Sequence, residues 1–315
     1  PERIHLSGLQ GSASAFLLAA AHQRSDFSTM NHLVVLDSAE SAAYFHNALE
    51  SLTGALDLFY YPASYKSPRD FIRLSSSHVM LRTEALMRFS RGGNKKILVT
   101  YPQALLEKVE SATQYADHVI TIKTGDSLDV PALLLKLDAH RFQRTDFVYE
   151  PGQFAIRGGI LDIYSFGNDK PYRIELFGAE VDSIRIVDPE TQLSERKILQ
   201  VNIIPHVEAL QSEAPRISLF EFLPANTLVW MEDEATTLDQ AKEWLLDLEA
   251  YLERAQPVSN AEEDDEKSLL RLPNRGDLLE LAELESGLAN FHRLAIGHSA
   301  VEPFDTLEFH TQEQP

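Results

Sequence analysis

The chain has 315 residues, of which 44% are hydrophobic and 24% charged, and its formal net charge is -20. This length suggests about two domains, and the absence of an apolar run of about 18 residues excludes a membrane-spanning helix. The acidic balance argues against a general nucleic-acid binder, because phosphate contacts need clustered Lys and Arg. The lack of cysteine excludes disulfides, thiolate catalysis and thiolate zinc sites, and it fits a cytoplasmic chain.

The charge is unevenly distributed along the chain. Residues 1–125 carry 12 basic and 11 acidic side chains, residues 126–208 carry 9 and 14, and residues 209–315 carry 7 and 23. The run Glu262 to Glu266 in the last third is predicted to be a solvated loop, with an electrostatic docking tail as the alternative. The eleven histidines show no HExxH spacing, so we expect no metal site. Because the chain opens on Pro1 without a basic-then-apolar leader, we expect a fragment of a longer protein.

The first segment alternates short apolar runs with helical patterns, which is typical of βα units and a parallel sheet. The predicted strands are 6–10, 32–36 and 96–100, and the predicted helices are 13–24, 41–52, 69–90 and 103–109.

From about Asp126 the pattern changes to short strands separated by Gly, Pro and Asp. These predicted strands are 147–149, 154–157, 160–164, 172–177 and 183–187. After Pro205 the chain returns to an αβ pattern, with a strand at 227–231 and helices at 238–252 and 278–291. We therefore expect one αβ domain, formed by residues 1–125 and 209–315, split around a β-rich insert at 126–208.

A glycine-containing turn occupies the place of a phosphate-binding loop, between the first strand and the first helix. A working loop, G-x-x-x-x-G-K-[ST], needs a lysine for the β- and γ-phosphates and a hydroxyl for Mg²⁺. Ser14 and Ala15 stand in those places, and Ala13 replaces the second glycine. A tight strand-to-helix turn is the favoured interpretation, although amides at the helix start could still hold an anion.

A second stretch, 228–234, is an apolar strand that ends in carboxylates and superficially resembles a Walker B motif. Glu232 and Asp233 fit a solvated turn and helix start better. Without the lysine they cannot stabilise the charge of a phosphoryl transfer, so no catalytic residue is expected in this chain.

The most specific motif is GQFAIRGGILDIY at 152–164, followed by PYRIELFG at 171–178 and VDSIR at 181–185. It resembles the second domain shared by the repair helicase UvrB and the transcription-repair coupling factors (Mfd), which in both families docks the damage sensor UvrA. The resemblance extends over essentially the whole chain and implies a P-loop, RecA-like αβ domain split around a β-rich insert, as in UvrB domains 1a, 2 and 1b. The degenerate loop of Gly8, Gly11, Ser12, Ser14 and Ala15 is similar to that of the coupling factors, whereas UvrB keeps the lysine. Likewise, residues 222–235 resemble the Asp-Glu-Ser-His region of UvrB with its carboxylates reordered, and the short stretch 59–69 leaves little room for the DNA-clamping hairpin of UvrB.

The resemblance places the UvrA-binding face at Arg157, Arg173 and Phe177. From the residues alone, the favoured interpretation is an ordinary strand-surface pair of Arg173 and Glu175, with Phe177 in the core. The resemblance reverses that order. The docking interpretation rests on bidentate pairing of Arg with carboxylates, and on the anchor area that an exposed aromatic ring supplies. Gly158 and Gly159 are predicted to shape a turn that presents Arg157.

By the same resemblance, the full-length protein is expected to be an ATP-dependent DNA translocase that displaces stalled RNA polymerase. ATP, Mg²⁺, RNA polymerase and double-stranded DNA would be bound by downstream regions, and this region needs no cofactor of its own. Two alternatives stay open: a fragment of a UvrB-like helicase subunit, and a purely autoinhibitory module in contact with the C-terminal region of its own chain.

Overall fold

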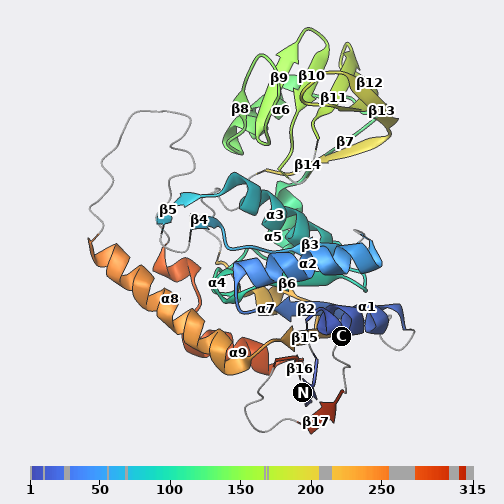
Figure 1. The fold of residues 1–315 in the computed structure, drawn as a ribbon. Coiled ribbons are helices and arrows are strands. Elements are labelled where there is room, and N and C mark those ends of the chain that lie inside the picture. Colours follow the sequence, from blue (N-terminus) through green and yellow to red (C-terminus); the bar gives the residue numbers. More distant parts are fainter. Residues whose placement is uncertain are drawn as a thin grey trace. The chain divides into compact units, whose positions relative to one another are not determined.

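The computed structural model describes residues 2–9, 11–24, 29–54, 57–67, 70–166, 168, 170–205, 215–254, 274–297 and 305–309. Gln10, Arg69 and the acidic run at 262–266, on which some expectations fall, lie outside these residues. The chain forms two compact units (Figure 1). Unit 1 comprises residues 1–78, 91–109 and 216–315, and unit 2 comprises residues 79–90 and 110–215. Within the described ranges, no helix is both long and apolar enough to cross a membrane.

Unit 1 is built on a parallel sheet. Among the described residues it has seven strands in the order β17-β1-β16-β15-β2-β6-β3, and every pairing is parallel. The strands are β1 (Arg3–Ser7), β2 (Asn31–Val35), β3 (Leu58–Tyr60), β6 (Ile97–Thr100), β15 (Thr227–Met231), β16 (His292–Ala295) and β17 (Asp305–Glu308). The central strands β2, β6 and β15 are buried at every position, which explains their apolar runs at 33–35, 97–99 and 228–231.

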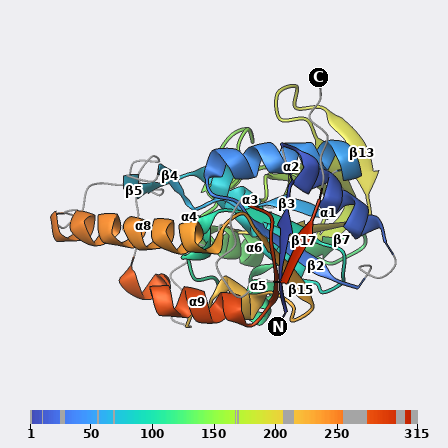
Figure 2. The same cartoon turned by 60° about the horizontal axis from the view of Figure 1, so that its bottom comes forward.

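Helices cover both sides of this sheet. Figure 2 shows α1 (Ala13–Gln23) and α2 (Ala39–Thr53) on one side, and α9 (Leu281–Ala289) on the other. Right-handed crossovers require this, because β1 to β2 and β15 to β16 run in opposite directions across the sheet. Other helices that the structure describes in this unit are α4 (Pro102–Leu105), α7 (Leu219–Phe222), α8 (Glu234–Arg254) and the 3-10 turn Arg275–Asp277.

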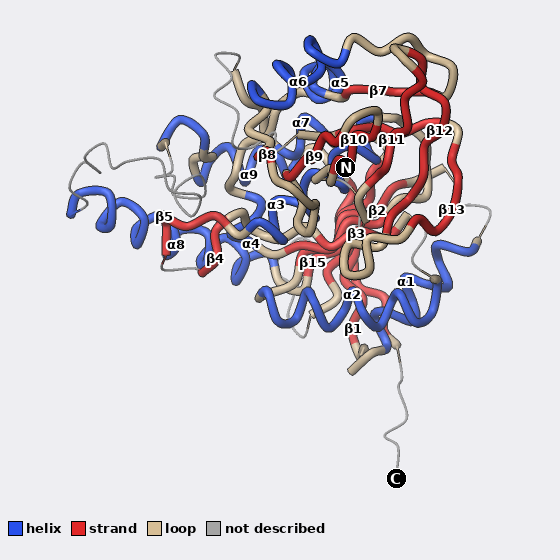
Figure 3. Tube along the Cα trace, turned by 90° about the horizontal axis from the view of Figure 1, so that it is seen from above, coloured by secondary structure: helices blue, strands red, loops and turns tan. Residues whose placement is uncertain are grey.

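Unit 2 is built on a mostly antiparallel sheet, with the strand order β13-β12-β11-β10-β9-β8 among the described residues (Figure 3). The strands are β8 (Gln143–Arg144), β9 (Gln153–Arg157), β10 (Ile160–Ile163), β11 (Tyr172–Phe177), β12 (Glu180–Val187) and β13 (Ser194–Ile198). One face packs against α6 (Val130–Ala139), whose Leu133 and Leu137 join Leu161, Ile174 and Ile184 in a buried core. A separate pair, β7 (Ile120–Lys123) and β14 (Gln200–Ile203), adds Ile122 and Val201 to the same core.

Four predicted elements differ from the observed ones. The strand predicted at 6–10 lies earlier in the chain, because β1 spans Arg3–Ser7. The helix predicted over 69–90 is wrong in its first part, because β4 (Tyr65–Ser67) and β5 (Asp70–Leu74) form a short hairpin before α3 (Ser76–Ser90). The strand predicted at 147–149 is a loop, and the helix predicted over 103–109 is the single turn α4. Helices α5 (Ala112–His118) and α6 were not predicted.

Candidate functional site

The solvent-facing side of the unit 2 sheet is polar, and we call it the polar face. It is defined by the side chains at Arg157, Asp162, Arg173, Glu175 and Phe177. The register places Asp162 directly opposite Arg173, and Ile160 directly opposite both Arg157 and Glu175. Side chains alternate between the two faces of a strand, so Leu161 and Ile174 enter the core while these residues point away from it.

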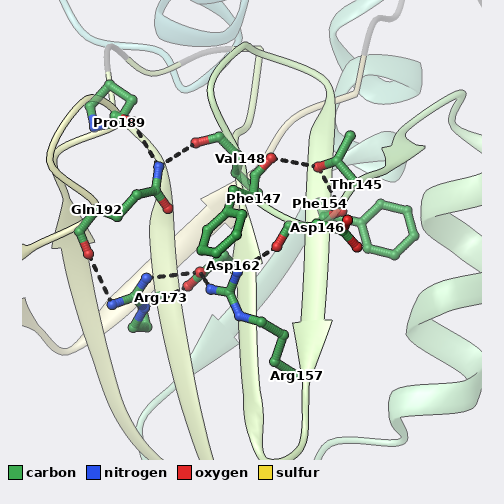
Figure 4. Close-up of polar contacts among 10 residues, drawn as sticks. All are labelled: Thr145, Asp146, Phe147, Val148, Phe154, Arg157, Asp162, Arg173, Pro189 and Gln192. Atoms are coloured by element: carbon green, nitrogen blue, oxygen red, sulfur yellow. Dashed lines mark hydrogen bonds and ion pairs between the residues drawn. The ribbon is translucent and has the colours of Figure 1, made fainter.

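Asp162 joins the two arginines of the predicted docking site (Figure 4). Arg173 donates from Nε to Oδ1 at 2.7 Å and from Nη2 to Oδ2 at 2.9 Å, a bidentate pair. Arg157 donates from Nη2 to Oδ2 at 2.6 Å. The carboxylate side chain is only 3% exposed, whereas Arg157 is 36% and Arg173 16% exposed. One buried negative charge therefore holds two guanidinium groups at the surface.

The chemistry of this triad leaves a net positive charge. Hydrogen bonding to Asp162 raises the pKa of Arg173 above its ordinary value. Guanidinium groups in general remain charged throughout the physiological pH range. A buried carboxylate is tolerated because its partners replace the hydration it has lost. With two cations and one anion, this triad could pair with one more carboxylate from outside.

Besides Asp162, two loops hold the arginines in place, one at 146–148 and one at Gln192. Arg157 places its guanidinium carbon 4.5 Å from the centre of the Phe147 ring and also donates to the carbonyl of Asp146. Arg173 donates from Nη1 to the carbonyl of Gln192 at 3.3 Å. The Gln192 side chain in turn donates to the carbonyl of Val148 at 3.0 Å and thereby ties the two loops together (Figure 4).

Phe177 lies at the end of β11, four residues after Arg173, and its side chain is the most exposed large apolar group described, at 84%. The turn Gly178-Ala179 follows it at once, and Gly178 has φ 65°. Two-residue hairpins of this kind favour a positive φ, which glycine adopts without strain. Gly158-Gly159 makes the corresponding turn after Arg157, with Gly158 at φ 60°. Phe177 and Arg157 therefore each lie directly before a tight turn, and the two turns are at the same end of the sheet.

The second predicted group, Gly8, Gly11, Ser12, Ser14 and Ala15, lies in unit 1 between β1 and α1. Gly8 and Gly11 have φ of 80° and 55°, and Ser12 begins the helix without a side-chain cap. Ala15 is buried, so its side chain belongs to the core. A Cβ at Gly8 would lie 1.9 Å from the carbonyl oxygen of Phe309, because the chain after β17 passes directly over it. A carbonyl oxygen at this point disfavours an anion.

The carboxylates after β15 act as structural groups in unit 1. Asp233 accepts from the amide of Thr236 at 2.7 Å, as the residue before a helix does. Glu232 accepts from the amide of Asp37 at 3.4 Å. Burial, with Glu232 and Asp233 nearby, raises the pKa of Asp37 to about 6.

The sequence reasoning gave no role to Asp162, Phe147 or Gln192. Asp162 carries a readable signal, because it is a charge within the apolar run Ile160 to Ile163, and a buried charge needs a partner on a neighbouring strand. Phe147 and Gln192 come from loops, and their approach to the arginines depends on the tertiary fold.

Comparison with known proteins finds relatives for the same part of the chain. Residues 120–208 match the family described as the UvrB interaction domain. Transcription-repair-coupling factors are similar over more of the chain. Those of Staphylococcus epidermidis and Staphylococcus aureus strain bovine RF122 are 32% and 31% identical over 202 and 199 residues, which is 64% and 63% of this chain and 17% and 16% of theirs. That of Haemophilus influenzae is 30% identical over 174 residues, 55% of this chain and 15% of its own.

The β-rich segment at 120–208 is therefore a UvrB interaction domain. The chain is similar to the transcription-repair-coupling factors, and its segment 120–208 matches a domain named for UvrB. It spans less than a fifth of the length of the relatives it matches.

Proposed function

We propose that this chain is a docking module that recruits the repair protein UvrA through the polar face of unit 2. The observation that carries the proposal is the arrangement of Phe177, 84% exposed, on the strand that also presents Arg173. The segment that holds them matches the UvrB interaction domain. The resemblance of this segment to UvrB and the coupling factors implies UvrA as the partner.

The physical argument rests on preorganisation. An exposed aromatic ring and surface arginines are the residue types that dominate interface energies once they are buried by a partner. Here Asp162 and Phe147 already restrict the guanidinium groups, so little side-chain entropy remains to be lost on binding. The predicted partner surface has an apolar pocket for Phe177 and a carboxylate facing Arg157 and Arg173.

The roles of the complete protein extend this proposal. We assign the parallel-sheet unit to the P-loop, RecA-like fold, with the UvrB-like layout of 1–125, 126–208 and 209–315. We further propose that the complete protein is a cytoplasmic, ATP-dependent DNA translocase that displaces stalled RNA polymerase, with ATP, Mg²⁺, DNA and polymerase held outside this chain. The names of the relatives support a role that links transcription to repair. Ser14 in place of the loop lysine supports a non-catalytic role for this region.

The proposal is tested by calorimetric titration of the chain with UvrA from the same organism. We expect Phe177→Ala and Arg173→Ala each to weaken binding by about 2 kcal/mol or more, as buried anchors do. The matched control is Leu135→Ala, because Leu135 is 73% exposed but lies on α6, which covers the opposite face of the sheet. The Leu135→Ala variant should bind UvrA with the same affinity as the parent.

Melting temperatures of all three variants establish that each is folded. If the folded parent does not bind UvrA, or if Leu135→Ala weakens binding as much as Phe177→Ala does, docking through the polar face is wrong. The alternative, an autoinhibitory contact of this surface with the C-terminal region of the same protein, would then be tested next.

A further inference from the structure

A row of basic residues crosses the polar face, starting at the proposed docking site. Arg173 on β11 is directly opposite Arg185 on β12, and Arg185 is directly opposite Lys197 on the edge strand β13. Directly opposite residues project from the same face of a sheet. The three cations therefore form one line across the neighbouring strands β11, β12 and β13. Figure 3 shows the order of these strands.

This row carries a cost that the fold alone does not explain. Like charges directly opposite each other destabilise a sheet. The pairing of these cations with carboxylates also becomes weaker from Arg173 to Lys197. Arg173 forms a bidentate pair with Asp162, and Arg185 has its Nε 3.6 Å from Glu175. Lys197, exposed on β13, has no ion pair among the described residues.

The chemistry of the face selects an acidic protein surface over a nucleic acid. Glu175 lies among the cations, and Glu180 and Asp182 are exposed on the same strand as Arg185. Residues 126–208 as a whole carry 9 basic and 14 acidic side chains. A phosphate backbone is uniformly negative and would meet these carboxylates, whereas a protein can place its acidic residues opposite the cations only.

We propose that the docking surface continues from Phe177 and Arg173 across β12 and β13 to Lys197, and that it receives an acidic patch on the same protein partner. This inference rests on the docking function proposed above. Arg185 and Lys197 act mainly in the approach of the two proteins, because exposed charges at an interface rim change the association rate more than the contact energy.

The chain offers a matched control in the neighbouring residue. Arg196 and Lys197 are consecutive and exposed on β13, but Arg196 lies opposite Ile186 and Lys197 opposite Arg185, so they belong to opposite faces. Lys197→Glu and Arg196→Glu change the net charge equally. Any difference in association rate between the two variants therefore depends on which face of the sheet is changed, and not on the total charge.

The experiment measures the association rate of each variant with UvrA by stopped flow, at about 50 and 300 mM salt. Lys197→Glu should slow association about tenfold at the lower salt concentration and much less at the higher one. Arg196→Glu should stay within about twofold of the parent at both. Lys197→Ala should show a smaller loss, which keeps the test valid if the charge reversal disturbs β13; melting temperatures check this.

The outcomes separate this inference from the docking function itself. If Lys197→Glu and Arg196→Glu slow association equally, or neither does while Phe177→Ala still abolishes binding, the extended surface is wrong and docking stands. If the parent does not bind UvrA, both are wrong. A labelled DNA duplex is titrated in parallel; if Lys197→Glu weakens binding to the duplex and not to UvrA, the row is a nucleic-acid contact and our proposal is overturned.

Discussion

At the scale of the residue, Asp162 shows how one buried charge organises a surface. Asp162 lies between Leu161 and Ile163 in the sequence of a strand that is otherwise apolar, and its carboxylate oxygens accept from both Arg157 and Arg173. The partner would touch the arginines and not Asp162, because the carboxylate is almost completely covered. Asp162 is therefore a positioning residue for the proposed docking site.

We expect Asp162→Asn to destabilise unit 2 by about 2 to 3 kcal/mol, because the amide keeps the shape but leaves two guanidinium groups without their counter-charge. Thermal or urea unfolding measures the loss. Asp182→Asn is the matched control, since Asp182 is exposed on β12, and it should change stability by less than about 0.5 kcal/mol. Equal stability of Asp162→Asn and the parent would show that the ion pairs do not support the fold.

At the scale of the element, the sequence predicts structure where the signal is local. The hairpin turns Gly158-Gly159 and Gly178-Ala179 are readable because a two-residue turn needs a positive φ. The loop at 147–149 was predicted as a strand because its residues are apolar. Val148 is indeed buried, against Ala155 and Tyr164, but its neighbours do not pair as a strand. Instead, the Gln153 side chain accepts from the amides of Tyr149 and Glu150 at 2.9 and 3.1 Å.

Non-local pairing explains the other differences. The helical spacing predicted over 69–90 fails at β5, because Asp70–Leu74 pairs antiparallel with β4. The approach of Arg173 to Gln192 likewise joins residues 19 apart in sequence. Of the predicted site, sequence could indicate Arg157, Arg173 and Phe177 through a motif, but the loop contacts that fix the arginines needed the fold.

The turn after β1 gives a prediction at the same scale. A phosphate loop acts through its lysine and its free amides, whereas here Ser14 replaces the lysine and the Phe309 carbonyl lies over Gly8. We expect 1 mM ATP with Mg²⁺ to leave the melting temperature of the chain unchanged. A ligand present at 100 times its Kd would stabilise the fold by about 2.7 kcal/mol. A rise of several degrees that disappears on chelation of Mg²⁺ would contradict this.

At the scale of the whole molecule, two titrating groups in unit 1 give opposite dependences of stability on pH. His32 is completely buried on β2, where its Nδ1 accepts from Trp230 at 3.2 Å. Burial, with His22 nearby, lowers the pKa of His32 to about 4. Burial and the neighbouring Glu232 and Asp233 raise the pKa of Asp37 to about 6.

The signs follow from proton uptake in the folded and unfolded states. As the pH falls from about 6.5 to 4, His32 binds its proton in the unfolded state first, so this group lowers the free energy of unfolding. Over much of the same range Asp37 binds its proton in the folded state first, because its unfolded pKa is about 3.9, and this group raises that free energy. The two contributions partly cancel in the parent chain.

Single substitutions should separate these contributions in urea unfolding at pH 7.5 and 4.5. Relative to the parent, His32→Asn should lose less stability on acidification, by about 2 kcal/mol, because its amide cannot take up the unfolded-state proton. Asp37→Asn should lose more, because the folded state no longer gains a proton there. The chain has two tryptophans, Trp230 and Trp244, both in unit 1, so their fluorescence follows this unit alone even when the two units unfold separately. If both variants follow the pH dependence of the parent, other groups set the acid stability of unit 1, and the buried environment assigned to His32 and Asp37 is wrong.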